Sequence, residues 1–539
     1  AQVAAYWGVE SLPATTGLTA IELFEQIQAG KIKALWIACT NPAQSLPDQN
    51  SVRAALAACP FVVLQEAFRT TETAAYADLL LPAASWGEKE GTVTNSERRV
   101  SHVRRAITPP GEARPDWAIT VDFARRLQHR LRPGSASLFA FEQPAQIFDE
   151  YKGLTRDRDL DLSGLSHALL DQIGPQQWPF PVGAQTGTPR LYTQGTFPTE
   201  TGRAHFIADP YRAAKEQRDA RFPLTLITGR LRDQWHGMSR TGTAAQLFGH
   251  VSEALLSLHP DELRRHRFKE GDLVSLKSRR GSVIVAVGSD DSVRPGQAFL
   301  TMHWGDRFLK GGVNVLTPPA FDALSKQPEL KHSGVRLEPV QLPWQLFALI
   351  EGNIQQHFEA LRPLCEGFAY VSLSLAGRER PALLVRAAHT EAPDLQLLTR
   401  IDELLGLNDG PVMAYDDPRR SIGKRVKIEK GRITALRLAG ETLARHWLQS
   451  LWQEGRADEQ LRRWLLAPLS APPGGTTAST KTLCNCKNVS ESAVCAGIGR
   501  GLDLDGLKLE LGCGTQCGSC VPEIKRLLAS NPQPIAISG

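Results

Sequence analysis

Hydrophobic positions in the first 130 residues follow two different patterns. In three segments apolar residues recur at helical spacing, and in two others they form short consecutive runs bounded by turn residues. The helical segments are residues 19–29, 51–58 and 115–131, and the runs are 32–39 and 61–65. A helical period predicts an amphipathic helix, and a short apolar run predicts a buried strand. The order strand, helix, strand with short connections predicts a right-handed βαβ unit in a parallel sheet.

The pattern changes near Phe222, where short β-type runs separated by turn residues begin. Such runs predict a compact β-barrel of about 120 residues. A further region mixes strands with helices and contains a hairpin expected to turn at Lys430-Gly431, followed by a Pro/Gly/Ser/Thr-rich linker. The predicted parts are 1–215 (α/β), 216–342 (β-barrel), 343–467 (α+β, role unknown), 468–481 (linker) and 482–539 (small, Cys-rich and helical).

Length and charge narrow the class of protein. The 539 residues allow three or four domains at about 150 residues each. The formal net charge of +5 is too small to indicate a nucleic-acid partner. The chain contains no apolar run of about 18 residues, so no membrane span is predicted. The opening AQVAAYWGVE lacks the basic and apolar regions of a signal peptide, and we expect a cytoplasmic protein.

Six of the nine cysteines crowd the C-terminal part. The pair Cys484-x-Cys486 and the later pair Cys517-x2-Cys520 can present four thiolates to a metal. Zinc ribbons usually use two C-x2-C knuckles, so the C-x-C pair favours an iron–sulfur cluster over zinc. Disulfides are the least favoured alternative, because nothing marks a secreted protein.

The segments CNCKNVSESAV and CGTQCGSC resemble the bacterioferritin-associated ferredoxin-like [2Fe-2S] domain, from Thr482 to about Ser530. The resemblance implies four cluster ligands, which are Cys484, Cys486, Cys517 and Cys520. Cys495 and Cys513 fall outside the pattern and are expected to be small buried thiols. Three glycines can turn the backbone tightly around the cluster; they are Gly512, Gly514 and Gly518. Lys481, Lys487 and Lys508 could offset its charge, although the default interpretation is that they are solvated surface lysines.

Polar residues follow the apparent strands of the first part. In an open parallel sheet, ligands bind beyond the carboxyl ends of the strands. Glu66 suits the hydroxyls of a ribose, Asp116 can accept from the N1–H and amino group of guanine, and Lys89 can meet a phosphate. Asn41 and Gln65 stand at equivalent positions.

Several longer segments resemble the molybdopterin oxidoreductases of the dimethyl sulfoxide reductase family. They are TNPAQSLPD, YADLLLPAASWGEKEGTVTNSERRV, PPGEARPDW, TGRLRDQWHGMSRTG and NVLTPPAFDALSKQPELKHSGVRLEP. The resemblance covers roughly residues 1–340 and implies a double-psi-type dinucleotide-binding barrel and a molybdenum bis(molybdopterin guanine dinucleotide) cofactor. The implied cofactor contacts are Asn41, Gln65, Glu66, Lys89, Asp116, Thr228, Gly229, Arg230, Trp235, His236, Gly237, Asn314 and Lys331.

The combination of these molybdopterin-oxidoreductase segments with a C-terminal [2Fe-2S] domain resembles the catalytic subunits of bacterial assimilatory nitrate reductases. The resemblance implies cytoplasmic reduction of nitrate to nitrite. Electrons would come from a flavoprotein, ferredoxin or flavodoxin through the [2Fe-2S] domain and then an N-terminal [4Fe-4S] cluster. The chain holds no C-x2-C-x3-C segment, and neither Cys39 nor Cys59 sits in a molybdenum-ligand motif. We therefore expect a fragment whose N-terminal part is absent, and which does not reduce nitrate alone. A formate dehydrogenase of the same superfamily and a non-catalytic electron-transfer subunit are the alternatives.

Overall fold

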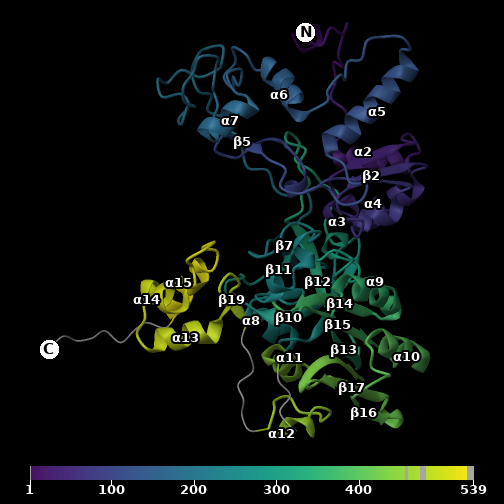
Figure 1. Ribbon diagram of the computed structural model, residues 1–539. Helices are drawn as coiled ribbons and strands as arrows, with labels where there is room; N and C mark the ends of the chain where they lie inside the picture. The colour runs from purple at the N-terminus through teal and green to yellow at the C-terminus, as the bar shows by residue number, and fades with distance from the viewer. Residues whose placement is uncertain (1, 456–458, 474–480, 531–539) are drawn as a thin grey trace, which may run out of the picture. The chain divides into compact units, whose positions relative to one another are not determined.

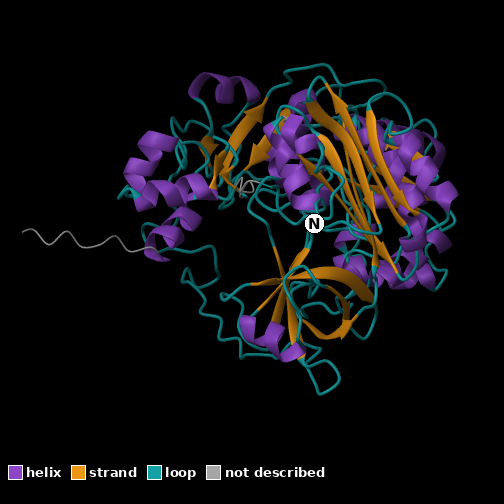
Figure 2. Cartoon of the chain, turned by 90° about the horizontal axis from the view of Figure 1, so that it is seen from below, coloured by secondary structure: helices purple, strands orange, loops and turns teal. Residues whose placement is uncertain are grey.

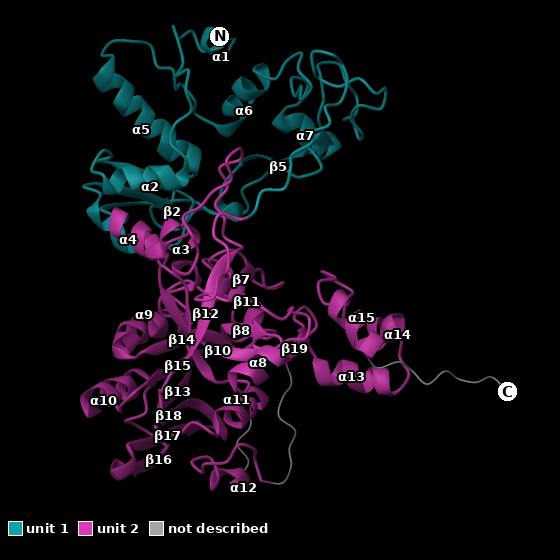
Figure 3. Cartoon of the chain, turned by 180° about the vertical axis from the view of Figure 1, so that it is seen from behind, with its two compact units in different colours: residues 1–40, 56–69, 74–213 teal, residues 41–55, 70–73, 214–539 magenta. Residues whose placement is uncertain are grey.

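The computed structural model describes residues 2–455, 459–473 and 481–530 (Figure 1). Helices and strands occur throughout these ranges, joined by many loops (Figure 2). The chain forms two compact units (Figure 3). Unit 1 comprises residues 1–40, 56–69 and 74–213, and unit 2 comprises residues 41–55, 70–73 and 214–539. The boundaries of the five parts predicted from the sequence differ from those of the two units, and they stay predictions.

Unit 1 contains a three-stranded parallel sheet of order β1-β2-β3. Its strands are β1 (Leu35–Ala38), β2 (Val62–Glu66) and β3 (Leu79–Pro82). Ala38 pairs with Gln65, so β1 and β2 end side by side at one edge of the sheet. The predicted parallel pairing of the first two strands is confirmed, and β3 is added to it by the fold.

Helix α2 (Ala20–Gln28) shows how local sequence fixes an element of unit 1. The carboxylate of Glu22 accepts hydrogen bonds from Thr19 N at 2.9 Å and Thr19 Oγ1 at 2.6 Å, so Thr19, the first residue of the predicted helical segment, is the N-cap. Ile21, Phe24 and Ile27 form its buried face. The remaining helical segments of unit 1 are α1 (Gln2–Tyr6), η2 (Trp86–Glu88), α5 (Asp116–Leu131), α6 (Pro144–Gly153) and α7 (His167–Ile173). Two further segments, α4 (Gln49–Ala58) and η1 (Glu72–Tyr76), each contain residues of both units.

A second sheet in unit 1 is antiparallel. It consists of β4 (Gly91–Thr94), β5 (Arg99–Val103) and β6 (Gln176–Gln177) in the order β4-β5-β6. A small core fixes α6 and α7 relative to β5; its members are Val100, Phe148, Leu162, Leu165, Leu170 and Phe180. This packing brings α7 close to β5 although more than sixty residues separate them in the chain.

Unit 2 contains the predicted β-barrel, which is a closed barrel of six strands in the order β10-β8-β11-β7-β12-β9. The strands are β7 (Leu224–Gly229), β8 (Leu255–Leu258), β9 (Leu273–Lys277), β10 (Ser282–Ser289), β11 (Gln297–Thr301) and β12 (Ser333–Pro339). Because β7 and β11 are parallel and Gly229 pairs with Thr301, both strands end at the same edge of the barrel. Its short helices are α3 (Pro42–Ser45), η3 (Thr241–Thr243), η4 (Ala245–Phe248), α8 (Pro260–His266) and η5 (Val313–Val315). Whether the barrel is of the double-psi type stays a prediction.

An antiparallel six-stranded sheet follows, in the order β14-β15-β13-β18-β17-β16. Its strands are β13 (Trp344–Glu351), β14 (Tyr370–Ala376), β15 (Ala382–His389), β16 (Val412–Asp417), β17 (Ile422–Glu429) and β18 (Arg432–Ala439). Lys430 and Gly431 join β17 to β18 with φ angles of 51° and 74°, so the predicted hairpin is confirmed.

Helices cover both faces of this sheet (Figure 2). Leu346 and Leu349 of β13 point to opposite sides, toward α9 and α10 on one and α11 on the other. The helical segments here are α9 (Ile354–Leu364), η6 (Cys365–Gly367), α10 (Leu395–Leu404), η7 (Pro418–Arg420), α11 (Arg445–Glu454) and α12 (Glu459–Arg462).

The C-terminal module, residues 481–530, is small, helical and cysteine-rich, as predicted. It consists of β19 (Thr482–Cys484), β20 (Val489–Ser490), α13 (Glu491–Gly499), α14 (Leu504–Leu511) and α15 (Val521–Ser530). Its core is built mainly from Leu483, Val494, Ile498, Leu507 and Ile524. Across the described ranges, none of the helices combines the length and the apolar character that crossing a bilayer requires.

Candidate functional site

Two predicted contact residues of unit 1, Gln65 and Lys89, converge on a third, Asp116, which is the first residue of α5. Gln65 Nε2 donates to Asp116 Oδ1 at 2.8 Å, and Lys89 Nζ donates to Oδ2 at 2.7 Å. The Cys39 thiol, just past the end of β1, also donates to Oδ1 at 3.2 Å. Burial opposes ionisation of Asp116, but these hydrogen bonds outweigh it and lower its pKa. The result is an ionised carboxylate ringed by donors at the carboxyl ends of β1 and β2.

Cys39 and Glu66 take roles that the sequence did not predict. Burial and the neighbouring Asp116 raise the pKa of Cys39 to about 11, so it is a neutral donor rather than a nucleophile. Glu66 Oε1 accepts from its own neighbours, Ala67 N at 2.8 Å and Phe68 N at 3.3 Å. In the sequence, the only signal for Cys39 was its position at the end of the first predicted strand.

In unit 2, the predicted dinucleotide loop leaves the end of β7. The guanidinium of Arg230 lies 5.3 Å from the ring centroid of Trp235, a cation–π contact, and Trp235 meets His236 edge to face at 4.6 Å. Trp235 is half-exposed, so its ring and the Arg230 charge are presented to solvent together. This arrangement can bind an anionic group that carries a flat ring.

A residue that sequence reasoning missed, His303, holds this loop. Its Nδ1 donates to His236 O at 2.6 Å, and its Nε2 accepts from Leu231 N at 2.9 Å. The ring must be neutral to donate and accept at once, and burial lowers its pKa accordingly. His303 follows β11, so its position at the barrel edge was the available signal; only the fold places β11 beside β7.

Two glycines of the loop are explained by packing. A Cβ on Gly229 would lie 2.6 Å from the ring of Phe299, and one on Gly237 would lie 2.6 Å from Gln44 Oε1. Gln44 in turn donates from Nε2 to Met302 O at 3.2 Å, which connects α3 to the segment after β11. Both positions therefore exclude side chains, and the predicted approach of a pyrophosphate stays a prediction.

The predicted asparagines lie in unit 2 and secure α3. Asn314 Nδ2 donates to Gln44 O at 3.0 Å and Ser45 O at 3.1 Å. Asn41 Oδ1 accepts from Thr73 Oγ1 at 2.7 Å, and Asn41 Nδ2 donates to Glu72 Oε2 at 2.6 Å. Both side-chain amides are thus engaged within the protein.

The last two predicted contacts lie beside β7. Thr228 Oγ1 donates to Leu330 O at 2.7 Å, which fixes the neighbouring Lys331 close to the start of the loop. Lys331 is exposed. The barrel edge therefore brings Thr228, Lys331 and the Arg230 loop together.

The four predicted cluster cysteines meet as two pairs in the C-terminal module. Cys486 Sγ lies 3.3 Å from Cys517 Sγ, and the Cys484 thiol is hydrogen-bonded to that of Cys520. None of the cysteines in the described ranges forms a disulfide. Cys484 and Cys520 are buried while Cys517 is exposed, so one side of the sulfur group faces solvent. Two pairs of thiols, one pair for each iron, fit a [2Fe-2S] cluster.

The surroundings of the thiols confirm the predicted glycine turns. Gly512, Gly514 and Gly518 have φ angles of 69°, 75° and 72°, the left-handed region that glycine adopts without strain. Cys513 is buried, as expected, and contacts Leu507 O at 3.5 Å. The expectation for Cys495 is wrong: it lies on the outer face of α13 and is exposed.

Two of the three lysines that could offset the charge of a cluster pair with carboxylates. Lys508 pairs with Asp505 at 2.9 Å, and Lys481 pairs with Glu491 at 3.0 Å and Glu523 at 2.7 Å. A neighbouring carboxylate satisfies each ammonium group. Lys487 instead lies over Gly512.

Glu523 of α15 joins the module to the barrel. Its Oε2 lies 2.8 Å from His250 Nε2 and 3.1 Å from Arg232 Nη1, and Arg232 also donates to Leu483 O at 2.5 Å. The hydrogen bond with His250 and that from Lys481 outweigh burial and lower the pKa of Glu523 to about 2. A second link comes from Arg378, which donates to Asn485 O at 2.6 Å.

We expect Glu523→Gln to destabilise the module by about 1–3 kcal/mol at pH 7, because hydrogen bonds to a buried charge are lost. A carboxylate with a depressed pKa contributes stability above its unfolded pKa of about 4.3. The wild-type advantage should therefore shrink as the pH falls from about 4 toward 2. Denaturant unfolding of both proteins at pH 7 and pH 3 measures it.

The matched control is Glu510→Gln, which breaks an exposed ion pair with Arg500 in the same module. It should cost less than about 1 kcal/mol. An equal loss from both substitutions would show that Glu523 has no special role.

Three segments of the chain match known families. Residues 1–126 match Molybdopterin oxidoreductase, residues 224–334 match the Molydopterin dinucleotide binding domain, and residues 482–530 match the BFD-like [2Fe-2S] binding domain. The last two segments coincide with the barrel and the cysteine-rich module described above.

Several relatives are similar over long stretches. A nitrate reductase of Klebsiella oxytoca is 33% identical over 98% of this chain and 59% of its own length. The assimilatory nitrate reductase catalytic subunit of Bacillus subtilis is 35% identical over 63% of this chain and 47% of its own. The F420-dependent formate dehydrogenase subunit alpha of Methanocaldococcus jannaschii is 35% identical over 62% and 47%. The chain thus spans about half the length of the relatives it matches. It belongs to the molybdopterin oxidoreductases, and it joins their dinucleotide-binding domain to a C-terminal BFD-like [2Fe-2S] binding domain.

Proposed function

We propose that the protein to which this chain belongs reduces nitrate to nitrite in nitrate assimilation, in the cytoplasm. The observation that carries the proposal is the likeness to the Klebsiella oxytoca nitrate reductase, which extends over 98% of the chain and so includes both the barrel loop and the cysteine-rich module. The likeness to the formate dehydrogenase extends over 62%. The combination of the molybdopterin-oxidoreductase segments with the cysteine-rich module therefore favours nitrate as the substrate. The molybdopterin-oxidoreductase segments alone would not.

Two sets of residues in this chain would bind the cofactor, one set in each unit. In unit 2, Arg230 offers a charge to a phosphate, Trp235 offers a ring face, and His303 keeps their loop in one conformation. In unit 1, Asp116 and Lys89 offer an acceptor and a donor to a polar ring or phosphate. When bound, molybdenum bis(molybdopterin guanine dinucleotide) supplies oxygen-atom transfer coupled to exchange of two electrons. The molybdenum ligand is not assigned to any residue of this chain.

The module is the proposed entry point for electrons. A [2Fe-2S] cluster held by Cys484, Cys486, Cys517 and Cys520 supplies one-electron transfer. Cys517 is exposed, so a soluble donor can approach this side of the module closely. A flavoprotein, ferredoxin or flavodoxin is the proposed donor. The contacts of Glu523 and Arg232 keep the module against the barrel.

The test is a pair of assays on the purified, cofactor-loaded protein that contains this chain. With reduced methyl viologen as donor, we expect nitrite to form from nitrate, and with formate and oxidised viologen we expect no reduction. Formate oxidation without nitrite formation would contradict the nitrate proposal and favour a formate dehydrogenase. If protein with full molybdenum content catalysed neither of the two reactions, the result would favour an electron-transfer subunit.

The 539-residue chain by itself is expected to form no nitrite, because no residue in it is assigned as the molybdenum ligand. Nitrite formation by the chain alone would contradict that expectation.

A further inference from the structure

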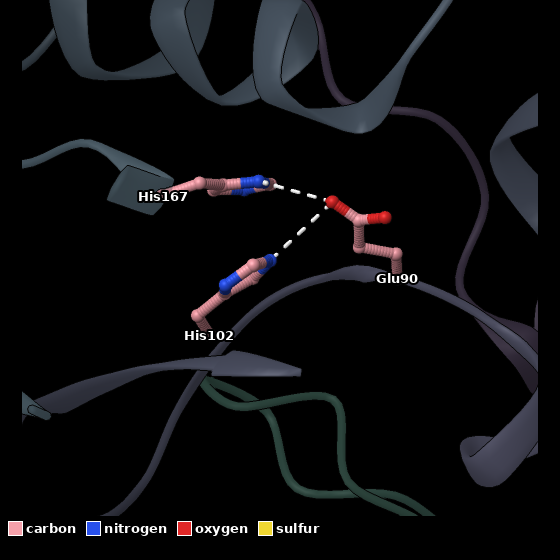
Figure 4. Close-up of side chains that lie close together, drawn as sticks. All are labelled: Glu90, His102 and His167. Carbon is pink, nitrogen blue, oxygen red and sulfur yellow. Dashed lines mark hydrogen bonds and ion pairs between the residues drawn. The ribbon is translucent and has the colours of Figure 1, made fainter. Parts of the chain in front are cut away.

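Two histidines and a glutamate meet in unit 1, and none of the three is among the residues proposed to bind the cofactor (Figure 4). Glu90 lies just before β4, His102 is on β5, and His167 is the first residue of α7. Glu90 Oε1 lies 3.4 Å from His102 Nε2 and 3.6 Å from His167 Nδ1. One ligand atom from each residue lies within 4.8 Å of the other two. Figure 4 shows both rings directing a nitrogen at the same carboxylate oxygen.

The two ring nitrogens of His167 are buried without a hydrogen-bond partner. Its side chain is 10% exposed, and neither Nδ1 nor Nε2 forms a hydrogen bond. A buried polar group left unpaired costs about 1–3 kcal/mol, so such groups call for an explanation.

His102 is already oriented as a metal ligand. Its Nδ1 lies 2.8 Å from Asp171 Oδ1, and the same carboxylate oxygen accepts from Arg104 Nε at 2.8 Å. Because Arg104 keeps Asp171 an acceptor, His102 Nδ1 donates to Asp171, and Nε2 is the ring nitrogen left to face Glu90 and to bind a metal. A carboxylate behind a histidine in this way is the usual outer partner of a metal-bound imidazole.

We propose that Glu90, His102 and His167 form a zinc site, with Asp171 as the positioning residue behind His102. Zinc–nitrogen and zinc–oxygen bonds of about 2.0–2.1 Å put tetrahedral ligands about 3.3–3.4 Å apart, close to the two distances to Glu90. Two imidazoles and one carboxylate are a donor set that zinc accepts, whereas magnesium and calcium prefer oxygen. Water completes the fourth position.

Zinc at this place would connect three segments that are distant in the sequence. It would tie α7 to β5 and to the turn before β4, next to the core of Val100 and Leu170. The ion would bind Nδ1, one of the two unpaired ring nitrogens of His167, and lower the cost of burying it. Its role would be to fix this part of unit 1, and it needs no molybdenum cofactor to do so.

The test is zinc binding by the full chain with its [2Fe-2S] cluster loaded, so that the module's cysteines are occupied. After removal of loosely bound metal with a chelator, zinc per chain and the affinity against a competing chelator are measured. We expect wild-type protein to hold about one zinc that His167→Gln does not hold. Glu90 is 48% exposed, so Glu90→Gln should fold normally and bind zinc at least tenfold more weakly. Asp171→Asn should weaken binding about 10–100-fold.

The matched control is His129→Gln, which replaces an exposed histidine on α5 of the same unit and should leave zinc binding unchanged. Cobalt substitution should give the absorption of a tetrahedral nitrogen and oxygen site without sulfur charge-transfer bands. Equal zinc content and affinity in wild type, His167→Gln and Glu90→Gln would overturn the proposal. A cobalt spectrum with sulfur bands that persist in His167→Gln would do the same.

Discussion

Replacing Cys486 by serine is expected to reduce the iron content of the chain from about two atoms to nearly none, and to bleach its brown colour. The Cys486 sulfur lies 3.3 Å from that of Cys517, in one of the two thiol pairs. A serine hydroxyl is not a thiolate, so one iron would lose a protein ligand. Iron and acid-labile sulfide analysis, with visible absorption spectra, measures the effect.

Cys495→Ser is the matched control for this prediction. Cys495 is an exposed cysteine of the same module, on α13, and it lies outside the two sulfur pairs. Its replacement should leave the iron content and the spectrum unchanged. A colourless wild-type chain with one bound zinc would show that the module is a zinc site, and equal iron loss from both substitutions would remove Cys486 from the ligand set.

Replacing Asp402 by alanine is expected to destabilise the six-stranded sheet by about 3–5 kcal/mol. Arg437 Nε and Nη2 each donate to one oxygen of Asp402 at 2.6 Å, and Arg437 Nη1 donates to Gly423 O at 2.8 Å. The two side chains are 3% and 7% exposed, so alanine would leave a guanidinium buried without its counter-ion. Because the chain has two compact units, amide hydrogen exchange in β17 and β18 follows the loss better than a single melting curve.

A matched pair on the same sheet separates burial from ion pairing. Asp416 and Arg425 pair at 2.9 Å, but the Asp416 side chain is 53% exposed, and Asp416→Ala should cost less than about 1 kcal/mol. The double replacement Asp402→Leu with Arg437→Met should recover most of the lost stability, because no charge is then left buried. Similar losses from Asp402→Ala and Asp416→Ala would contradict the prediction.

Local sequence determined the elements whose signals lie within a few residues. Thr19 and Glu22 fix the start of α2, because the capping contacts span one turn of helix. Lys430 and Gly431 form the turn of the β17–β18 hairpin, since both adopt the positive φ that such a turn requires. The spacing of the C-terminal cysteines likewise anticipated which four thiols would meet.

Contacts between distant segments were decided by the tertiary structure alone. His303 holds the dinucleotide loop because the barrel places β11 beside β7, and nothing near His303 in the chain records that pairing. The sequence left open whether Lys481 offsets the charge of the cluster or is a solvated surface residue, and the fold brings Glu523 of α15 to it. The exposure of Cys495 depended on which face of α13 the module core covers.

The sequence by itself therefore determined the parts of this protein: the parallel strands, the barrel, the mixed sheet, the cysteine-rich module and the family to which they point. Helix caps, turn residues and hydrophobic periods act over short distances, and each can be read where it stands. Only the tertiary structure decided which side chains share a site, such as Cys39 with Asp116 or His102 with His167. Those partners are joined by packing and hydrogen bonds across dozens of residues, and such contacts exist only once the chain has folded.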